Sequence, residues 1–104
     1  MSIFARLKSL FLRQPAAVDR QYEPYASVIE LALSKRGQPG NMAHDPVYRV
    51  PVYVVGMCEA LATKINEVGR TKVDVQDVLN IERTACGHVD YFNKFAMRCS
   101  QLAR

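Results

Sequence analysis

Apolar positions recur at intervals of three and four residues in five stretches of this 104-residue chain. This spacing places the apolar side chains on one face of an α-helix. The first stretch is SIFARLKSLFLRQP, which Ser2 can cap and Pro15 ends. Its apolar stripe consists of Ile3, Phe4, Leu7, Leu10 and Phe11. We therefore predict an amphipathic helix at residues 2–13, a candidate separable element of the chain.

Two longer apolar patterns follow, separated by a loop. The pattern over residues 24–36 begins at a proline and stops before a glycine, which are usual residues at helix ends. The run RGQPGNMAHDP predicts a loop at about residues 37–47. Residues 47–55 have the β-branched and aromatic content of a strand, but no second strand is present to pair with them. We therefore favour a helix at about residues 51–68. Its stripe comprises Val54, Cys58, Leu61, Ile65 and Val68.

The C-terminal third predicts two more helices, joined at Gly87. Asp74 and Asp77 have the spacing of a capping box at the start of the first of them. Gly87 is placed to end this helix in a left-handed conformation. The second helix then begins directly after Gly87 and runs to the C-terminus, with Asp90 and Lys94 spaced as an ion pair. Its apolar stripe is Val89, Phe92, Phe95 or Ala96, Cys99 and Leu102.

These elements predict an all-α fold, a compact bundle of four or five short helices in a single domain spanning residues 1–104. A chain of this length buries enough apolar surface to fold without disulfides or a metal. With 49% hydrophobic and 23% charged residues, its composition is that of a globular protein. Three cysteines cannot all pair within one chain, and their spacing is not that of a secreted disulfide framework. We expect a cytoplasmic protein.

Positive charge is concentrated at the N-terminus. Residues 1–15 carry three basic side chains and no acidic one, whereas the remaining residues carry 11 basic and 10 acidic ones. Any attraction to phosphate or anionic lipid is therefore expected in this segment. Arg6 and Lys8 interrupt its apolar run, which argues against a signal peptide, and no stretch approaches the roughly 20 apolar residues of a membrane-spanning helix. The stripe at residues 2–13 can pack on the core, on a partner protein or on a membrane surface, and we favour the core or a protein interface.

The segment ACGHVDYFNKFAMRC contains the residues that most resemble a reactive site. Cys86, His88, Asp90 and Cys99 lie within fifteen positions of one another. A structural zinc site needs four ligands in paired short spacings, which these residues do not form. A thiol, an imidazole and a carboxylate placed two residues apart across a helix junction would point in divergent directions. We predict no catalytic residue, no metal site and no cofactor, with Cys99 buried.

Polar residues around the same junction form a candidate site. They are Glu82, Arg83, Thr84, His88 and Asp90. Because buried polar groups must be paired, these residues can form a hydrogen-bond network that ties the last two helices together. Alternatively, they line an anion or nucleotide pocket at the start of the last helix, where free N–H groups point outward. We favour the structural role. A nucleotide or nucleic-acid function would draw on Arg83, Thr84, His88 and Arg49.

A longer run, VQDVLNIERTACGHVDYFNKFAMRCSQLA, is similar to the C-terminal part of small uncharacterised helical accessory proteins of tailed bacteriophages and prophages. The pattern E-R-x-A-C-G-H-x-D-Y-x-x-K-F-A carries this resemblance, which covers about residues 45–103. It implies a mobile-element protein that acts in the cytoplasm of a bacterial host cell by binding a host protein, such as a defence component. The resemblance brings no catalytic residue to this chain.

The sequence thus predicts a non-enzymatic accessory protein that docks on a partner protein through exposed helix faces. Its mechanism would be steric occlusion or stabilisation of a complex. Association into a homo-oligomer is a further mode, because a small helical chain can bury a surplus stripe against its own copy. Two alternatives belong to other classes: a nucleotide or nucleic-acid binding protein, and a peripheral membrane protein that uses residues 2–13.

Overall fold

Four α-helices and a short 3-10 turn form the part of the chain that the computed structural model describes, residues 20–104. In chain order these are η2 (Arg20–Tyr22), α2 (Tyr25–Ser34), α3 (Val52–Gly69), α4 (Val75–Ala85) and α5 (Tyr91–Leu102). The predicted all-α helical bundle is confirmed. Within residues 20–104 the only strand-like pairing is an isolated bridge between His44 and Pro51, so the strand alternative for residues 47–55 is wrong. The predicted helix at residues 2–13 and its stripe lie outside the described residues.

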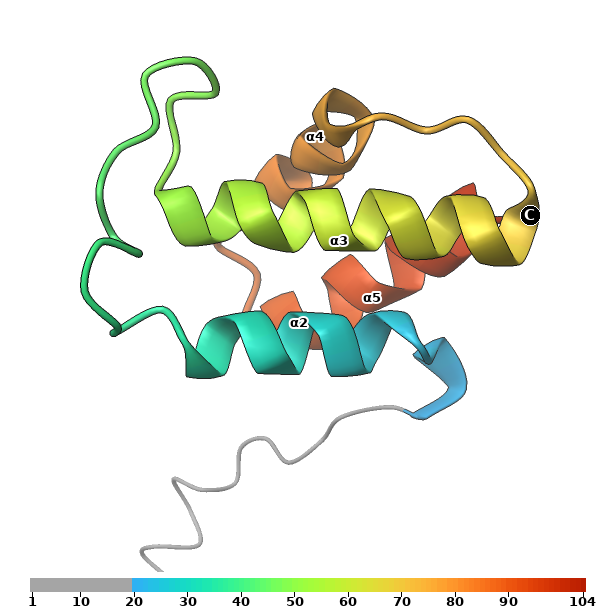
Figure 1. The fold of residues 1–104 in the computed structure, drawn as a ribbon. Coiled ribbons are helices and arrows are strands. Elements are labelled where there is room, and N and C mark those ends of the chain that lie inside the picture. Colours follow the sequence, from blue (N-terminus) through green and yellow to red (C-terminus); the bar gives the residue numbers. More distant parts are fainter. Residues whose placement is uncertain (1–19) are drawn as a thin grey trace, which may run out of the picture.

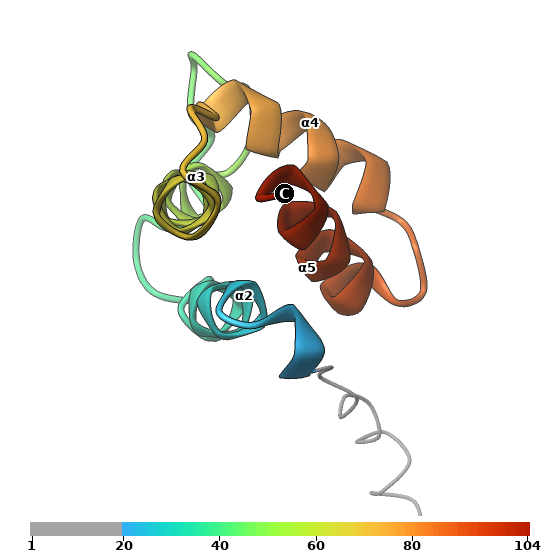
Figure 2. The same ribbon diagram turned by 90° about the vertical axis from the view of Figure 1, so that its right-hand side faces the viewer.

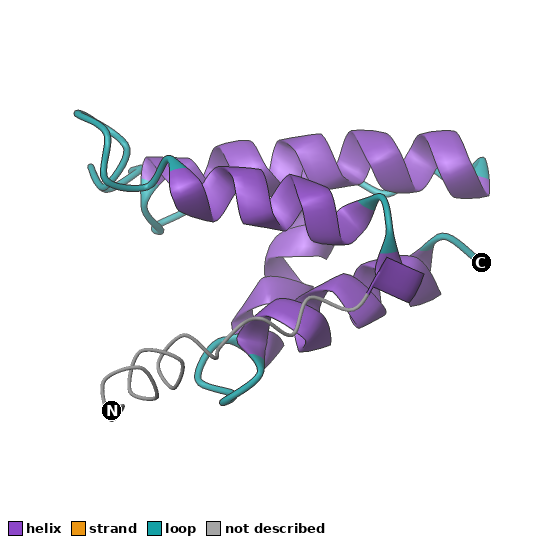
Figure 3. Ribbon diagram, turned by 90° about the horizontal axis from the view of Figure 1, so that it is seen from below, coloured by secondary structure: helices purple, strands orange, loops and turns teal. Residues whose placement is uncertain are grey.

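The helices α3 and α5 are the central elements of the bundle. Helices α2 and α3 lie side by side and run in opposite directions (Figure 1). A view along these two helices shows α5 packed against both, with α4 lying across α3 and α5 on the side away from α2 (Figure 2). The connecting segments lie at the ends of the helices (Figure 3). Because α3 and α5 each contact the other three helices, their buried faces organise the core.

The core consists largely of the apolar faces that helical periodicity predicts. On α3 and α5 the fully buried residues include Cys58, Leu61, Ile65, Phe95, Ala96 and Cys99. Two residues that the pattern places in the core are exposed, so these two predictions are wrong. Val68 is 58% exposed because it lies in the last turn of α3, which extends beyond α2 (Figure 1). Val89 is fully exposed because it precedes α5 and so does not share the periodic face of that helix.

Polar residues define the ends of α4. The Asp74 carboxylate accepts a hydrogen bond from the Asp77 N–H, and the Asp77 carboxylate accepts one from the Asp74 N–H, each at 3.0 Å. The predicted capping box is therefore confirmed. Gly87 adopts a φ of 94° just after the helix, as predicted. The expectation that α5 begins directly after Gly87 is wrong. Its first residue is Tyr91, because the His88 N–H instead donates back to the last turn of α4 at 3.0 Å.

The corner between α3 and α4 is held by side-chain hydrogen bonds and by a close backbone contact. The Asn66 side chain donates to the Val73 carbonyl at 2.9 Å and accepts from the Val73 N–H and the Thr71 hydroxyl, both at 2.8 Å. At the end of α3, a Cβ on Gly69 would lie 2.7 Å from the Ala103 Cα. Only glycine therefore lets the C-terminal ends of α3 and α5 meet.

Candidate functional sites at the helix junction and between α2 and α3

The structure divides the predicted polar cluster between the interior and the surface. Glu82 lies on the inward face of α4 and is only 8% exposed. Arg83 and Thr84 follow on the outward face of the same helix. His88 and Asp90 are exposed in the turn that precedes α5. The five residues therefore do not converge on one site.

A hydrogen bond joins α4 to α5 inside the bundle. The Tyr91 hydroxyl donates to the Glu82 Oε2 atom at 3.1 Å, and the Tyr91 ring packs on the Phe95 ring at 5.7 Å between centroids. Burial raises the pKa of Glu82, and the hydrogen bond from Tyr91 partly offsets this rise. Burial and the neighbouring Glu82 charge raise the pKa of Tyr91. This pair ties the last two helices together.

Three other weakly acidic groups are buried in the core: Tyr25 on α2, Cys58 on α3 and Cys99 on α5. Burial raises the pKa of the Cys99 thiol to about 12, and burial together with the Glu82 charge raises the pKa of Cys58. Burial, with the nearby Cys99, also raises the pKa of Tyr25. The Tyr25 hydroxyl finds no hydrogen-bond partner among residues 20–104. Because the thiolate is the reactive and metal-binding form of cysteine, the two buried thiols are inert packing groups at neutral pH.

A surface hollow of about 280 Å³ lies beside the first turn of α5. It is lined by Tyr22, His88, Val89, Asp90, Asn93, Lys94 and Met97. The ion pairs within residues 20–104 do not include Asp90 with Lys94, so that predicted pair is wrong; the Asp90 carboxylate accepts instead from the Asn93 amide at 3.4 Å. Because a lysine and an aspartate both line this small hollow, its electrostatic potential is not of a single sign. The arrangement therefore lacks the concentrated positive charge that attracts a phosphate.

A larger apolar groove of about 310 Å³ opens between α2 and α3. One wall is formed by α2 and the other by the first half of α3. The lining residues are Val28, Leu31, Ala32 and Lys35 on the first side, and Val52, Tyr53, Gly56, Met57 and Ala60 on the second, with Asn41 at one end. Leu31 is 55% exposed and Val52 is 40% exposed. An open apolar groove with exposed aliphatic side chains is typical of a protein interaction site.

Asn41 joins the two walls of this groove at one end. Its side-chain amide donates to the Lys35 carbonyl at 2.6 Å, just past the end of α2. Its own carbonyl accepts from the Tyr53 N–H at 2.9 Å, in the first turn of α3. The loop therefore satisfies backbone groups that helix ends leave unpaired, and it bridges the two walls. We infer that these hydrogen bonds between the loop and the helix ends hold the groove in place.

The apolar pattern over residues 24–36 predicts a buried stripe but not this groove, because Val28 and Ala32 have the helical spacing of core positions. Both are half-buried, because they pack against the core and also line the groove. A signal was present on the other wall, where Val52, Gly56 and Ala60 recur every fourth residue. Small residues on one helix face leave room beside a neighbouring helix, so this pattern indicates a gap or a close helix contact.

Within residues 20–104, no three histidine, cysteine or acidic side chains are grouped so that they could hold a metal ion. In the same part of the chain, no helix combines the length and the apolar content that a bilayer crossing requires.

Comparison with known proteins adds no relative. No protein-family model, no curated protein and no solved structure matches the chain. The groove and the buried pair must therefore be interpreted from their own geometry.

Proposed function

We propose that this protein acts without catalysis, by binding a helical segment of a partner protein in the α2–α3 groove. The observation that carries the proposal is the open apolar groove of about 310 Å³ with Leu31 more than half exposed at its wall. Amphipathic helices bind such grooves by inserting apolar side chains spaced three or four residues apart. The expected ligand is a helix with aliphatic or aromatic anchors on one face.

The chemistry of the interior supports a binding role. The strongest potential nucleophiles of the core, Cys58 and Cys99, are fully buried, and burial raises their pKa values. The Glu82 carboxylate is occupied by the Tyr91 hydroxyl. These groups therefore favour a stable bundle over a reacting centre.

The identity of the partner is a further part of the proposal. Resemblance to phage and prophage proteins over residues 45–103 favours a host protein in the bacterial cytoplasm, with a defence component as one candidate. A short groove is suited to steric occlusion, because a partner helix that is bound in it cannot bind its own target.

The test uses two matched substitutions, Leu31→Glu and Val68→Glu. Both residues are aliphatic, lie on helices and are more than half exposed, but only Leu31 lines the groove. Each full-length variant is immobilised, exposed to a bacterial host lysate, and its bound proteins are identified by mass spectrometry. The purified partner is then titrated by calorimetry.

We expect the partner to bind the Val68→Glu variant like the wild type, and to bind the Leu31→Glu variant at least about tenfold more weakly, because an interface anchor is replaced by a charge. Equal binding to all three proteins would show that the groove is not the interface.

A further inference from the structure

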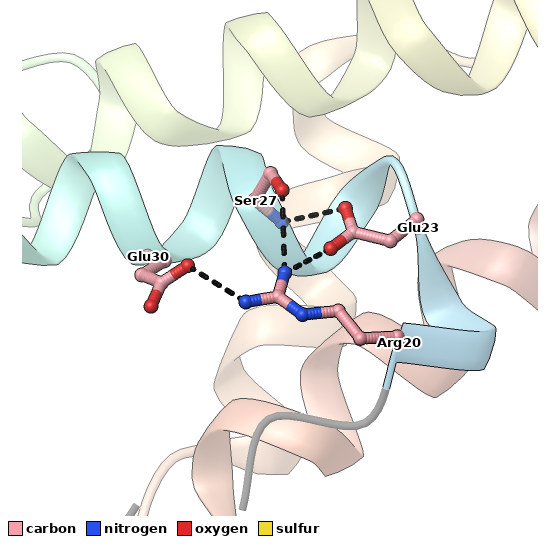
Figure 4. Close-up of polar contacts among 4 residues, drawn as sticks. All are labelled: Arg20, Glu23, Ser27 and Glu30. Atoms are coloured by element: carbon pink, nitrogen blue, oxygen red, sulfur yellow. Dashed lines mark hydrogen bonds and ion pairs between the residues drawn. The ribbon is translucent and has the colours of Figure 1, made fainter. Parts of the chain in front are cut away.

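The first described residue, Arg20, is held against the outer face of α2. Its guanidinium forms ion pairs with Glu23 and with Glu30, the second at 3.5 Å, and donates to the Ser27 hydroxyl at 3.5 Å (Figure 4). The Glu23 carboxylate in turn accepts from the Ser27 N–H at 3.1 Å (Figure 4). The 19 residues that precede Arg20 are therefore joined to the bundle beside α2, which forms one wall of the groove.

The length of these residues matches the distance to the groove. A helix over residues 2–13 would be ~18 Å long, and α2, with 10 residues, is ~15 Å long. The connector 14–19 spans at most ~20 Å when extended. A chain that turns back at the connector would therefore lie antiparallel to α2. Its first half, with Phe4 and Leu7, would then reach the end of α2 where Leu31 lines the groove.

The chemistry of the segment also matches that of the groove. The stripe presents aromatic and aliphatic side chains at helical spacing, as the apolar walls require. The opposite face carries three basic residues and no acidic one. The groove itself holds little charge: Lys35 is the one charged residue that lines it, and Glu30, which precedes Leu31, is paired with Arg20. The apolar stripe, rather than the basic face, would therefore supply the contact.

We propose that residues 2–13 occupy the α2–α3 groove of their own chain, and that a partner helix must displace them. The first half concerns the chain alone, whereas the second rests on the proposed function. The segment is tethered, so its effective concentration at the groove is high, and even a weak contact is populated. The partner's apparent affinity falls by the fraction of chains whose groove is covered.

Amide hydrogen exchange on the full-length chain tests the first half. The variants are Leu31→Glu in the groove and Phe4→Glu in the stripe, with Val68→Glu and Ser9→Glu as controls of equal charge. Ser9 lies opposite the stripe on the helical pattern. We expect amides of residues 2–13 to exchange at least about tenfold more slowly than in a free peptide of this segment. This protection should persist in both controls and disappear in both test variants, while the helices of residues 20–104 stay protected.

Four results would overturn the proposal. Exchange of residues 2–13 at free-peptide rates in the wild type would show that the segment does not occupy the groove. Protection that survives Leu31→Glu would place the segment elsewhere. Protection that rises with protein concentration, together with a dimer mass by light scattering, would assign the groove to a second copy. Protection seen only after adding vesicles of phosphatidylglycerol would likewise assign the segment to a membrane surface.

The same variants separate this inference from the proposed function. If both are correct, Phe4→Glu frees the groove and increases partner binding, whereas Leu31→Glu abolishes it. If only the groove's role in binding is correct, Leu31→Glu still weakens binding and Phe4→Glu changes nothing. If only the internal contact is correct, the exchange results hold, and no partner depends on Leu31.

Discussion

The hydroxyl of Tyr91 is the single donor that we expect to matter most for stability. It donates to the Glu82 Oε2 atom at 3.1 Å, and this carboxyl belongs to a residue that is only 8% exposed. The substitution Tyr91→Phe removes one oxygen and keeps the ring contact with Phe95. The buried Glu82 carboxyl then loses this hydrogen-bond donor, and α4 is no longer hydrogen-bonded to α5 at this point.

The magnitude follows from the cost of leaving a buried charged acceptor without its donor. A hydrogen bond to a charged group contributes about 1.5–3 kcal/mol, so Tyr91→Phe should lower the free energy of unfolding by about that amount. For a chain of this size each kcal/mol lowers Tm by roughly 4–8 °C. The pKa of Glu82 should also rise further, because Tyr91 is the group that lowers it most.

The matched control is Tyr25→Phe, which removes the same atom from another core tyrosine. The Tyr25 hydroxyl is buried without a hydrogen-bond partner among residues 20–104. Removing it should leave stability unchanged or raise it by up to about 1 kcal/mol, since no bond is lost and a polar group is no longer buried. Urea unfolding of both variants, followed by circular dichroism near pH 7, measures the two effects. Equal effects, or a loss below about 0.5 kcal/mol for Tyr91→Phe, would refute the role of this hydrogen bond.

Three further predictions concern stability. Gly69→Ala should destabilise the protein by about 1–3 kcal/mol in thermal unfolding, because the new Cβ would meet the backbone of Ala103; an unchanged Tm would contradict the close approach. Asp74→Ala should cost about 1 kcal/mol in urea unfolding by removing the cap of α4, whereas Asp74→Asn should cost less; equal losses would exclude capping as the cause. Because burial raises the pKa of Glu82, the folded chain holds this proton more tightly than the unfolded chain. Wild-type stability should therefore fall relative to Glu82→Gln as the pH rises above about 4.5, and parallel pH profiles of the two proteins would rule this out.

Much of the fold could be predicted from local patterns. The spacing of Asp74 and Asp77 located the start of α4, and Gly87 located the turn after it, because caps and left-handed turns depend on a few adjacent residues. The start of α5 was placed too early, since residues 88–90 complete a turn whose hydrogen bonds return to α4. Local signals therefore identified helices better than they identified the junctions between them.

The candidate sites depended on contacts that a one-dimensional pattern does not contain. The polar run at residues 82–90 looked like one cluster, yet helical geometry turns Glu82 inward and Arg83 outward. The partner of Glu82 is nine positions away, on the next helix. The distance between the two therefore depends on how α4 and α5 pack.

By itself, the sequence determined which segments are helical and which face of each is apolar, because helix period, caps and turn residues act over a few neighbouring positions. Only the tertiary structure decided which apolar positions are covered. Val28 and Ala32 fit the core pattern as well as Ile29 does, but only Ile29 is fully buried, whereas the other two pack against the core and also line an open groove. Burial is a property of the neighbours a residue meets, and those neighbours are set by the packing of whole helices.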